Sequence, residues 1–511
     1  MKLKLDLTNK KQNIALSAIL LAIMIAVAII MGYQYHAFSA YQAWFYTGNV
    51  DETQKFDRYS ETLKGTAGDS EIYVIKGTEN TVALTTTENA EKYDSLEKLN
   101  VSSVKAVGVI DSEQLIAAEK TMDAVFIDSV SSAAQAVSAL ENGIYDVAIL
   151  SYADAKEAIS KNDKLCVSEA EVEKVPKVLV LGGTHPNEPA GQLAATVFLE
   201  NAHIERGILY VITELNKSAY THSQPQEATT WYYDLTTKSG SKRTFKFGAR
   251  ATNTNQQWPN PDVYVHSSGQ NLSSTEVRNI NRAYPGSPTG NYTERVAYAV
   301  AELVRENDIT VVIDLHEAAP EYITINAMVA HDDANEMADI AGNWLMADYS
   351  ATDKDGNNIN GVKISVEKSP QTLHGLTHRE LGDYTNAYVF LCETSNASQG
   401  KLRGAFTEDL ITYSKTDKFY EYAAQWDGLL YARPVSINER VARHVLSVES
   451  IIEAFNESGY TRNTKSESSV NKLTDDLKQS SVYVGEFRLS GVPEYVNIID
   501  NGVGYYLADK D

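Results

Sequence analysis

A nearly continuous apolar segment, KVLVL at residues 177–181, constrains the fold of this chain more than any other feature. It lacks the polar alternation of a half-exposed strand and ends in Gly182-Gly183, which is typical of a strand buried on both faces that enters a loop. Further strands are expected at residues 207–213 and 310–314, and helices at 189–201 and 293–306. Strands that alternate with helices in this way predict an α/β fold, in which helices cover both faces of one sheet.

The chain of 511 residues exceeds the usual domain size several times, so two or three domains are expected. A boundary is predicted at Val175-Pro176, because proline does not continue a regular element. Near the end, Ser436 and Glu439 form a capping-box pattern for a helix to about Phe455, and short strands are expected at 482–487 and 495–499. The predicted parts are a cytoplasmic N-terminus (1–13), a transmembrane anchor (14–33), a stalk (34–70), a small α/β domain (71–174), a large α/β domain (175–432) and a C-terminal part (433–511).

The balance of charge argues against a nucleic-acid partner. There are 45 Lys and Arg residues against 68 Asp and Glu residues, and the resulting net charge of -23 is poorly suited to neutralising phosphates. The two cysteines, Cys166 and Cys392, can form neither a disulfide framework nor a Cys-rich zinc site. Stability is therefore expected to come from packing.

An apolar run at residues 14–31 is about 18 residues long, or roughly 27 Å as a helix, which nearly spans a bilayer core. Four lysines precede it with only Asp6 opposing them, so the positive-inside rule predicts a single-pass membrane protein whose remaining residues are extracytoplasmic. A cleaved signal peptide is the alternative. Its apolar region is usually about 7 to 15 residues with a cleavage site close behind, whereas here the polar residues 33–36 intervene, which favours an uncleaved anchor.

The pattern of residues 71–174 predicts a small domain of β-α-β type. A helix expected at 131–142 has apolar residues along one face and ends before Gly143, which favours a left-handed C-cap. The segment DSVSSAAQAVSALENGIYDVAILSYADA resembles one lobe of a periplasmic-type solute-binding protein. Any other small α/β domain with an Ala-rich helix fits this pattern equally well.

Two loops that follow expected strands carry a candidate metal-ligand set. His185 and Glu188 lie three residues apart in a tight turn after the strand at 177–181, and His316 follows the strand at 310–314. Strand ends are where α/β sheets place their ligands. Two imidazoles and one carboxylate, with a fourth position open to water, are a common donor set for catalytic zinc. We therefore expect His185, Glu188 and His316 to hold one Zn²⁺ ion.

A general base is expected at Glu393, which follows the apolar run at 387–392. Partial desolvation at a strand end raises the pKa of a carboxylate toward the range in which it accepts a proton from metal-bound water. Asp314 or Glu317 is expected to orient His316 by accepting a hydrogen bond from its outer nitrogen.

A carboxylate-binding pair is expected in RNINRAYPG, at residues 278–286. The guanidinium of Arg282 offers two parallel donors that match a carboxylate, and Asn281 beside it adds an amide donor. The polar stretch at 222–274 is expected to be a long insertion or loop system beside the site.

The motifs GGTHPNEPAG, NINRAYPG, IDLHEA and CETSN, in this order over residues 175–406, resemble those of the succinylglutamate desuccinylase/aspartoacylase family in the zinc carboxypeptidase-like superfamily. The resemblance implies a three-layer α/β/α fold with a mixed sheet of about eight strands, one zinc ion and amide hydrolysis. It assigns the same roles to the metal ligands, the general base and the carboxylate-binding pair, which are His185, Glu188, His316, Glu393, Asn281 and Arg282. Pro186 departs from the glycine usual at its position. The family's carbonyl-polarising arginine is matched by Arg250 or Arg278, and Arg379 and Tyr384 are further candidates for substrate contact.

Together these features predict a membrane-anchored, extracytoplasmic zinc hydrolase that cleaves an amide adjacent to a free carboxylate. Carboxypeptidase-like action on peptides is favoured, because a cell-surface site meets peptides more readily than a cytosolic metabolite. Deacylation of an N-acyl amino acid is the alternative within the same chemistry. An alternative from another class is a non-catalytic surface protein whose small domain binds a ligand.

Overall fold

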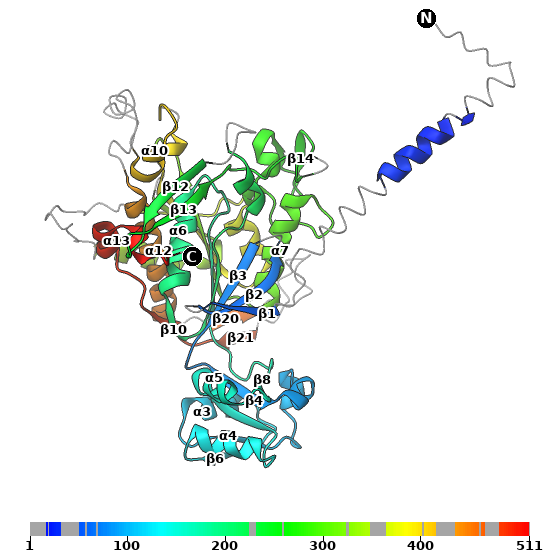
Figure 1. Ribbon diagram of the computed structural model, residues 1–511, viewed down its shortest axis with the longest axis vertical. Coiled ribbons are helices and arrows are strands. Elements are labelled where there is room, and N and C mark those ends of the chain that lie inside the picture. The colour runs from blue at the N-terminus through cyan, green and yellow to red at the C-terminus, as the bar shows by residue number, and fades with distance from the viewer. Residues whose placement is uncertain are drawn as a thin grey trace, which may run out of the picture.

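The computed structural model describes residues 17–18, 20–31, 51–56, 59–67, 70–223, 231–257, 260–322, 326–347, 364–400, 403–414, 435–458, 461–464 and 480–509. Within these ranges, nine strands form one mixed sheet in the larger part of the molecule (Figure 1). In order across the sheet they are β1 (Asp51–Phe56), β2 (Tyr59–Ala67), β3 (Ser70–Lys76), β11 (Ile208–Ile212), β9 (Lys177–Leu181), β16 (Val311–Ala318), β19 (Tyr388–Ser395), β17 (Ala327–Ala330) and β18 (Ser365–Lys368). The central strands β11, β9, β16 and β19 are parallel, and β3 and β17 pair antiparallel to their outer edges. The mixed α/β sheet predicted from the sequence is confirmed, with nine described strands where about eight were expected.

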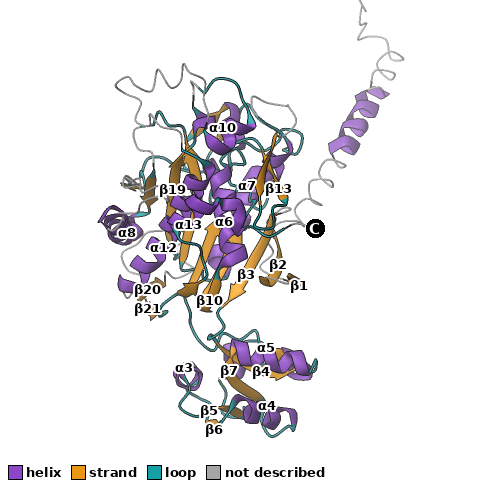
Figure 2. Ribbon diagram, turned by 60° about the vertical axis from the view of Figure 1, so that its left-hand side comes forward, coloured by secondary structure: helices purple, strands orange, loops and turns teal. Residues whose placement is uncertain are grey.

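Helices cover both faces of this sheet (Figure 2). Strand β9 is buried on both sides, because Val178 and Val180 pack into one apolar core while Leu179 and Leu181 pack into the other. This explains the unbroken apolar run in its sequence. The helices that contribute to the first core include α6 (Pro189–Asn201), α8 (Asn335–Ala347), α12 (Ile437–Ser458) and α13 (Tyr495–Asn501), and the second core contains α7 (Tyr292–Glu306).

The C-terminal residues complete the first core. Helix α12 begins after Ser436, whose Oγ accepts a hydrogen bond from the backbone N–H of Glu439 at 3.3 Å, as the capping pattern predicts. The prediction of a strand at 495–499 is wrong, because these residues form α13. Tyr495 and Ile498 are both buried on one face of that helix, and a three-residue spacing fits a helical period and not the two-residue period of a strand.

A second, five-stranded sheet forms the small domain. In order it contains β6 (Ile127–Val130), β5 (Ala106–Val109), β7 (Val147–Ser151), β4 (Thr81–Thr86) and β8 (Leu165–Val167), with helices α2 (Leu96–Leu99), α3 (Glu113–Thr121), α4 (Ala133–Glu141) and α5 (Tyr152–Lys161). This domain is inserted between β3 and β9 of the large sheet. The sequence placed residues 34–70 in a stalk and began the small domain at 71, whereas the strand pairing puts β1, β2 and β3 in the large sheet.

The stretch at 222–274, expected to be a loop system, contains two hairpins in its described part. These are β12 (Trp231–Thr236) with β13 (Lys242–Phe247), and β14 (Val263–Val265) with β15 (Asn271–Ser273). Two further pairs are β10 (His203–Arg206) with β22 (Arg488–Ser490), and β20 (Thr461–Thr464) with β21 (Ser480–Tyr483). Short helical segments include η3 (Ser274–Arg278), η4 (Ile280–Arg282), α9 (Gly382–Tyr384) and α10 (Glu408–Tyr413).

The predicted membrane anchor at 14–33 is described only at residues 17–18 and 20–31, which are helical and exposed. Among the described residues, no helix combines the length and the apolar character needed to cross a bilayer. The remaining residues of the predicted anchor lie outside the described ranges.

Candidate metal-binding active site

The three candidate metal ligands come together at one end of the parallel strands. His185 lies in the turn after β9, Glu188 stands at the N-cap of α6, and His316 lies within β16. Gly191 allows this arrangement, because a Cβ atom at that position would lie only 2.4 Å from the carbonyl oxygen of Leu315. The glycine therefore lets α6 approach β16 closely enough for Glu188 to reach His316.

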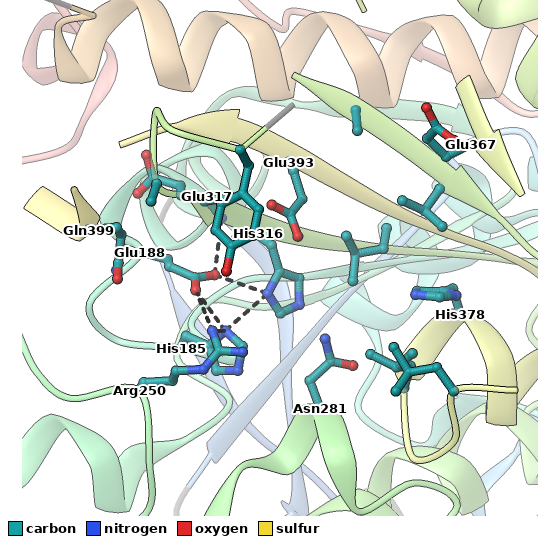
Figure 3. A pocket seen from close by; sticks show the side chains of 18 of the residues that line it. His185, Glu188, Arg250, Asn281, His316, Glu317, Glu367, His378, Glu393 and Gln399 are labelled. Atoms are coloured by element: carbon teal, nitrogen blue, oxygen red, sulfur yellow. Dashed lines mark hydrogen bonds and ion pairs between the residues drawn. The ribbon is translucent and has the colours of Figure 1, made fainter. Parts of the chain in front are cut away.

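The donor atoms of these three side chains face one another (Figure 3). His185 Nδ1 lies 2.8 Å from Glu188 Oε1, His316 Nδ1 lies 3.0 Å from Glu188 Oε2, and the two Nδ1 atoms are 3.1 Å apart. One ligand atom from each residue lies within 4.8 Å of the others, and all three residues are buried. Two imidazole nitrogens and a carboxylate that converge at this distance fit a divalent cation, and this donor set suits zinc.

The outer nitrogen of each histidine faces a fixed acceptor. His185 Nε2 lies 2.7 Å from Asn279 Oδ1, and His316 Nε2 lies 2.8 Å from Asp314 Oδ2. An acceptor at Nε2 favours the tautomer that carries its proton there, which leaves the Nδ1 lone pair free for a metal. Asp314, and not Glu317, is therefore the carboxylate next to the outer nitrogen of His316. Burial and the nearby Arg250 lower the pKa of His185, which keeps this imidazole neutral.

Glu317 supports the site from behind. Its backbone N–H donates to Glu188 Oε2 at 3.0 Å, while its carboxylate accepts from Arg440 Nη1 at 2.7 Å and from the Ala190 N–H at 3.0 Å. Arg440 and Glu317 are both fully buried. Arg440 belongs to α12, so the C-terminal part of the chain reaches the back of the metal site. No local pattern predicts this contact, because the two residues lie 123 positions apart in the sequence.

Glu393 lies beside the ligands on the neighbouring strand. In the register of β16 and β19 it pairs directly with His316, and the two side chains lie on the same face of the sheet. Desolvation and the adjacent Glu188 raise the pKa of Glu393 to about 7. Both strands continue past these residues, whereas the sequence placed each residue just after its strand. A carboxylate with this pKa is suited to accept and return a proton near neutral pH.

Two arginines line the cavity next to the metal ligands. Arg250 Nη1 lies 3.1 Å from Glu188 Oε1, and Arg250 Nε donates to Glu276 Oε1 at 3.1 Å. Glu276 also holds Arg282, whose Nε lies 3.2 Å from Oε2, and this double pairing lowers the pKa of Glu276 to about 2 against the opposing effect of burial. Arg278 instead donates to the carbonyl oxygen of Thr252. Of the two arginines that the sequence left open, only Arg250 lines the cavity.

The amide of Asn281 has a fixed orientation. Its Oδ1 accepts from the Thr377 N–H at 2.8 Å, so the side-chain NH₂ group is the part that faces the metal ligands (Figure 3). Thr377 also donates to Asp314 Oδ2 at 2.5 Å, which connects Asn281 to the support of His316. Asn281 and Arg282 both line the cavity, where their donors are available to a ligand.

The cavity has a volume of about 870 Å³. Its lining includes all six residues predicted from the sequence and Arg250. Arg379 and Tyr384, the further candidates for substrate contact, do not line it, because Arg379 pairs with Asp383 and Asp332 while the Tyr384 hydroxyl donates to Glu302. Other lining residues that the sequence did not single out include Glu367, His378 and Leu391.

No protein-family model matches the sequence, and no curated protein matches it. Among solved structures, the chain is similar to a succinylglutamate desuccinylase/aspartoacylase from Rhodobacter sphaeroides, with 14% identity over 55% of this chain and 55% of the other and a TM-score of 0.28. It is also similar to a variant of the cell shape determinant protein Csd4 from Helicobacter pylori, with 13% identity, 60% coverage of each chain and a TM-score of 0.28.

A separate match covers 18% of this chain. It is to an amino acid ABC transporter substrate-binding protein from Streptococcus pneumoniae, with 18% identity and a TM-score of 0.17. This chain spans 38% of the length of that protein, and 55% and 60% of the other two. Likenesses this slight establish neither a family nor an activity, so the assignment of function depends on the geometry of the site.

Proposed function

We propose that this protein is a zinc-dependent hydrolase that cleaves an amide bond adjacent to a free carboxylate. The observation that carries the proposal is the convergence of His185, Glu188 and His316 on one point, with Glu393 directly beside them in the register of the sheet. A buried set of three donors next to a carboxylate of raised pKa matches the needs of metal-assisted hydrolysis.

A zinc ion bound by these residues would lower the pKa of a water molecule and polarise the scissile carbonyl. The other steps belong to the side chains. Glu393 accepts the proton of the attacking water and returns it to the departing amine nitrogen, which is possible because its pKa lies near 7. The Arg250 guanidinium donates to the carbonyl oxygen as negative charge develops there. Asn281 and Arg282 bind the substrate carboxylate and so place the amide over the metal ligands.

Two substrate classes share this chemistry, namely peptides with a free C-terminus and N-acyl amino acids. We favour peptides and carboxypeptidase-like action, in line with the extracytoplasmic, membrane-anchored placement that we propose from residues 14–33. That placement is supported by the apolar run and the preceding lysines of the sequence. A cavity of about 870 Å³ has room for a substrate larger than a single amino acid.

The test is hydrolysis by the full chain of acyl dipeptides and N-acyl amino acids, each with a free carboxylate and as the carboxamide. The proposal predicts zinc-dependent release of the amine from free-acid substrates and much slower release from the carboxamides. Glu393→Gln should retain zinc and reduce kcat by about 10² to 10⁴. Bound zinc without hydrolysis of any compound would favour the ligand-binding alternative. Equal rates on free acids and carboxamides would remove the role of Asn281 and Arg282.

A further inference from the structure

The cavity extends from the metal ligands to an opposite wall that the proposed reaction does not use. Figure 3 shows Glu367 and His378 on that wall, away from His185 and Glu188. Glu367 belongs to β18 and is half-buried. Among the described residues it has neither an ion pair nor a hydrogen bond, although an acidic side chain in a cavity is normally paired.

The register of the sheet fixes where Glu367 lies relative to the reacting centre. Glu393 of β19 pairs with Ala327 of β17. Two residues away on each of these strands, Leu391 pairs with Val329. Val329 pairs in turn with Glu367 of β18. Directly paired residues and those two positions apart share one face of a sheet. Glu367 therefore lies on the same face as Glu393, two strands across and two residues along, and their Cα atoms are roughly 12 Å apart.

The surface between these two carboxylates is apolar. Val329 and Leu391 lie between them in the sheet, and Leu376 lines the same cavity. An aliphatic chain lying over this surface would make favourable contacts, and a polar chain would lose hydration without compensation. The distance and the lining fit a side chain of about the length of lysine.

Among the described residues, no cationic side chain forms an ion pair with Glu367. Burial lowers the pKa of His378 to about 3, so this imidazole is neutral at physiological pH. Lys368 follows Glu367 in β18 and also lines the cavity, but its side chain is exposed and the two side chains form no ion pair. The cationic side chains Arg250 and Arg282 are both held by Glu276 near the metal ligands. The Glu367 carboxylate is thus free to pair with a ligand.

We propose that Glu367 forms a subsite for a primary amine at the end of an aliphatic side chain, so that the protein prefers substrates whose free carboxylate belongs to a lysine-type residue. The inference rests on the proposed function and specifies its substrate class. In this arrangement Arg282 and Asn281 hold the carboxylate, the scissile amide lies at the metal ligands, and the aliphatic chain crosses Val329 and Leu391 to Glu367.

The test compares acetyl-alanyl dipeptides and N-acetyl amino acids that end in lysine, norleucine or glutamate, each as the free acid. Norleucine has the same aliphatic chain as lysine without the amine. The wild type is expected to show a kcat/KM for lysine about 10-fold to 100-fold above that for norleucine, as expected for one charge-assisted contact. Glu367→Gln should remove this preference and leave hydrolysis of the norleucine substrates nearly unchanged. Glu367→Lys should shift the preference toward glutamate.

Glu321→Gln is the matched control, because Glu321 also lines the cavity but does not lie on the sheet face that leads to Glu367. This variant should keep the preference for lysine, and its loss would show that a diffuse negative potential, and not a contact with Glu367, selects the amine. Equal kcat/KM for lysine and norleucine in the wild type would overturn the subsite while leaving the proposed function in place. No hydrolysis of any compound would overturn both.

Discussion

Replacement of Glu393 by glutamine should make the metal-free protein more stable at alkaline pH while it abolishes activity. Burial and Glu188 raise the pKa of this carboxyl from the ordinary 4.5 to about 7. Each pKa unit corresponds to about 1.4 kcal/mol, so ionised Glu393 costs the folded state about 3 kcal/mol. Because the pKa is raised on folding, the contribution of Glu393 to stability is fully present below about pH 4.5 and is lost as the pH rises through 7.

Glutamine does not ionise and so avoids this cost. Glu393→Gln is expected to unfold at a higher temperature than the wild type at pH 8, and at nearly the same temperature at pH 4.5. The measurement is thermal unfolding at both pH values in the presence of a chelator, because a bound cation would offset the charge of Glu393. If the variant is no more stable than the wild type at pH 8, or equally stabilised at both pH values, then ionised Glu393 does not destabilise the folded state.

Glu449→Gln is a matched control for this experiment. Burial and the neighbouring Glu453 and Glu494 raise the pKa of Glu449 to about 7 as well, but Glu449 lies on α12 and does not line the cavity. It should therefore gain stability at pH 8 in the same way and keep full hydrolytic activity. Activity lost in both variants would show that the loss in Glu393→Gln reflects a general change in the fold.

Three further predictions concern the same site. The kcat of the zinc-loaded protein should rise with pH, because ionised Glu393 is the base. The midpoint should lie at or below about 7, because a nearby cation lowers the pKa of Glu393. A kcat that falls over this pH range would contradict the assignment of the base. Arg440→Met should lower the free energy of unfolding by about 3 to 5 kcal/mol in denaturant, because it leaves the buried Glu317 carboxylate without its ion-pair partner. The double variant Arg440→Met with Glu317→Met should recover most of this loss if the broken ion pair causes it. Arg250→Ala should reduce kcat by about 10² to 10³ with little change in KM. Arg282→Ala should raise KM for free-acid substrates alone. The reverse pattern would show that Arg282 donates to the carbonyl oxygen and Arg250 binds the substrate carboxylate.

The sequence predicted those parts of the fold and site that depend on local pattern. The apolar run of β9 and the capping residue Ser436 before α12 are short-range signals, and the structure bears out the elements that they predicted. His185 and Glu188 share one turn, so their meeting could be expected from spacing alone. Their meeting with His316 followed from the rule that parallel strands end at one edge of a sheet.

The remaining features depend on contacts between distant segments. Arg440 meets Glu317 only because α12 packs behind β16, and no local pattern marks that contact. Glu367 faces the cavity because of the register of β17 and β18, which a one-residue slip would reverse. The small domain follows β3 in the sequence, whereas β3 pairs with β11 of the large sheet. The order of the segments therefore concealed that β3 belongs to the large sheet.

Zinc titration of the chelator-treated full chain, followed by calorimetry, tests directly whether His185, Glu188 and His316 bind a metal ion. We expect the wild type to bind one zinc ion per chain, and His203→Ala to bind it equally well, because His203 is exposed in β10. His185→Ala and His316→Ala should bind no zinc with measurable affinity. Zinc binding that is absent from the folded wild type, or that persists unchanged when either buried histidine is replaced, would contradict this assignment of the metal ligands.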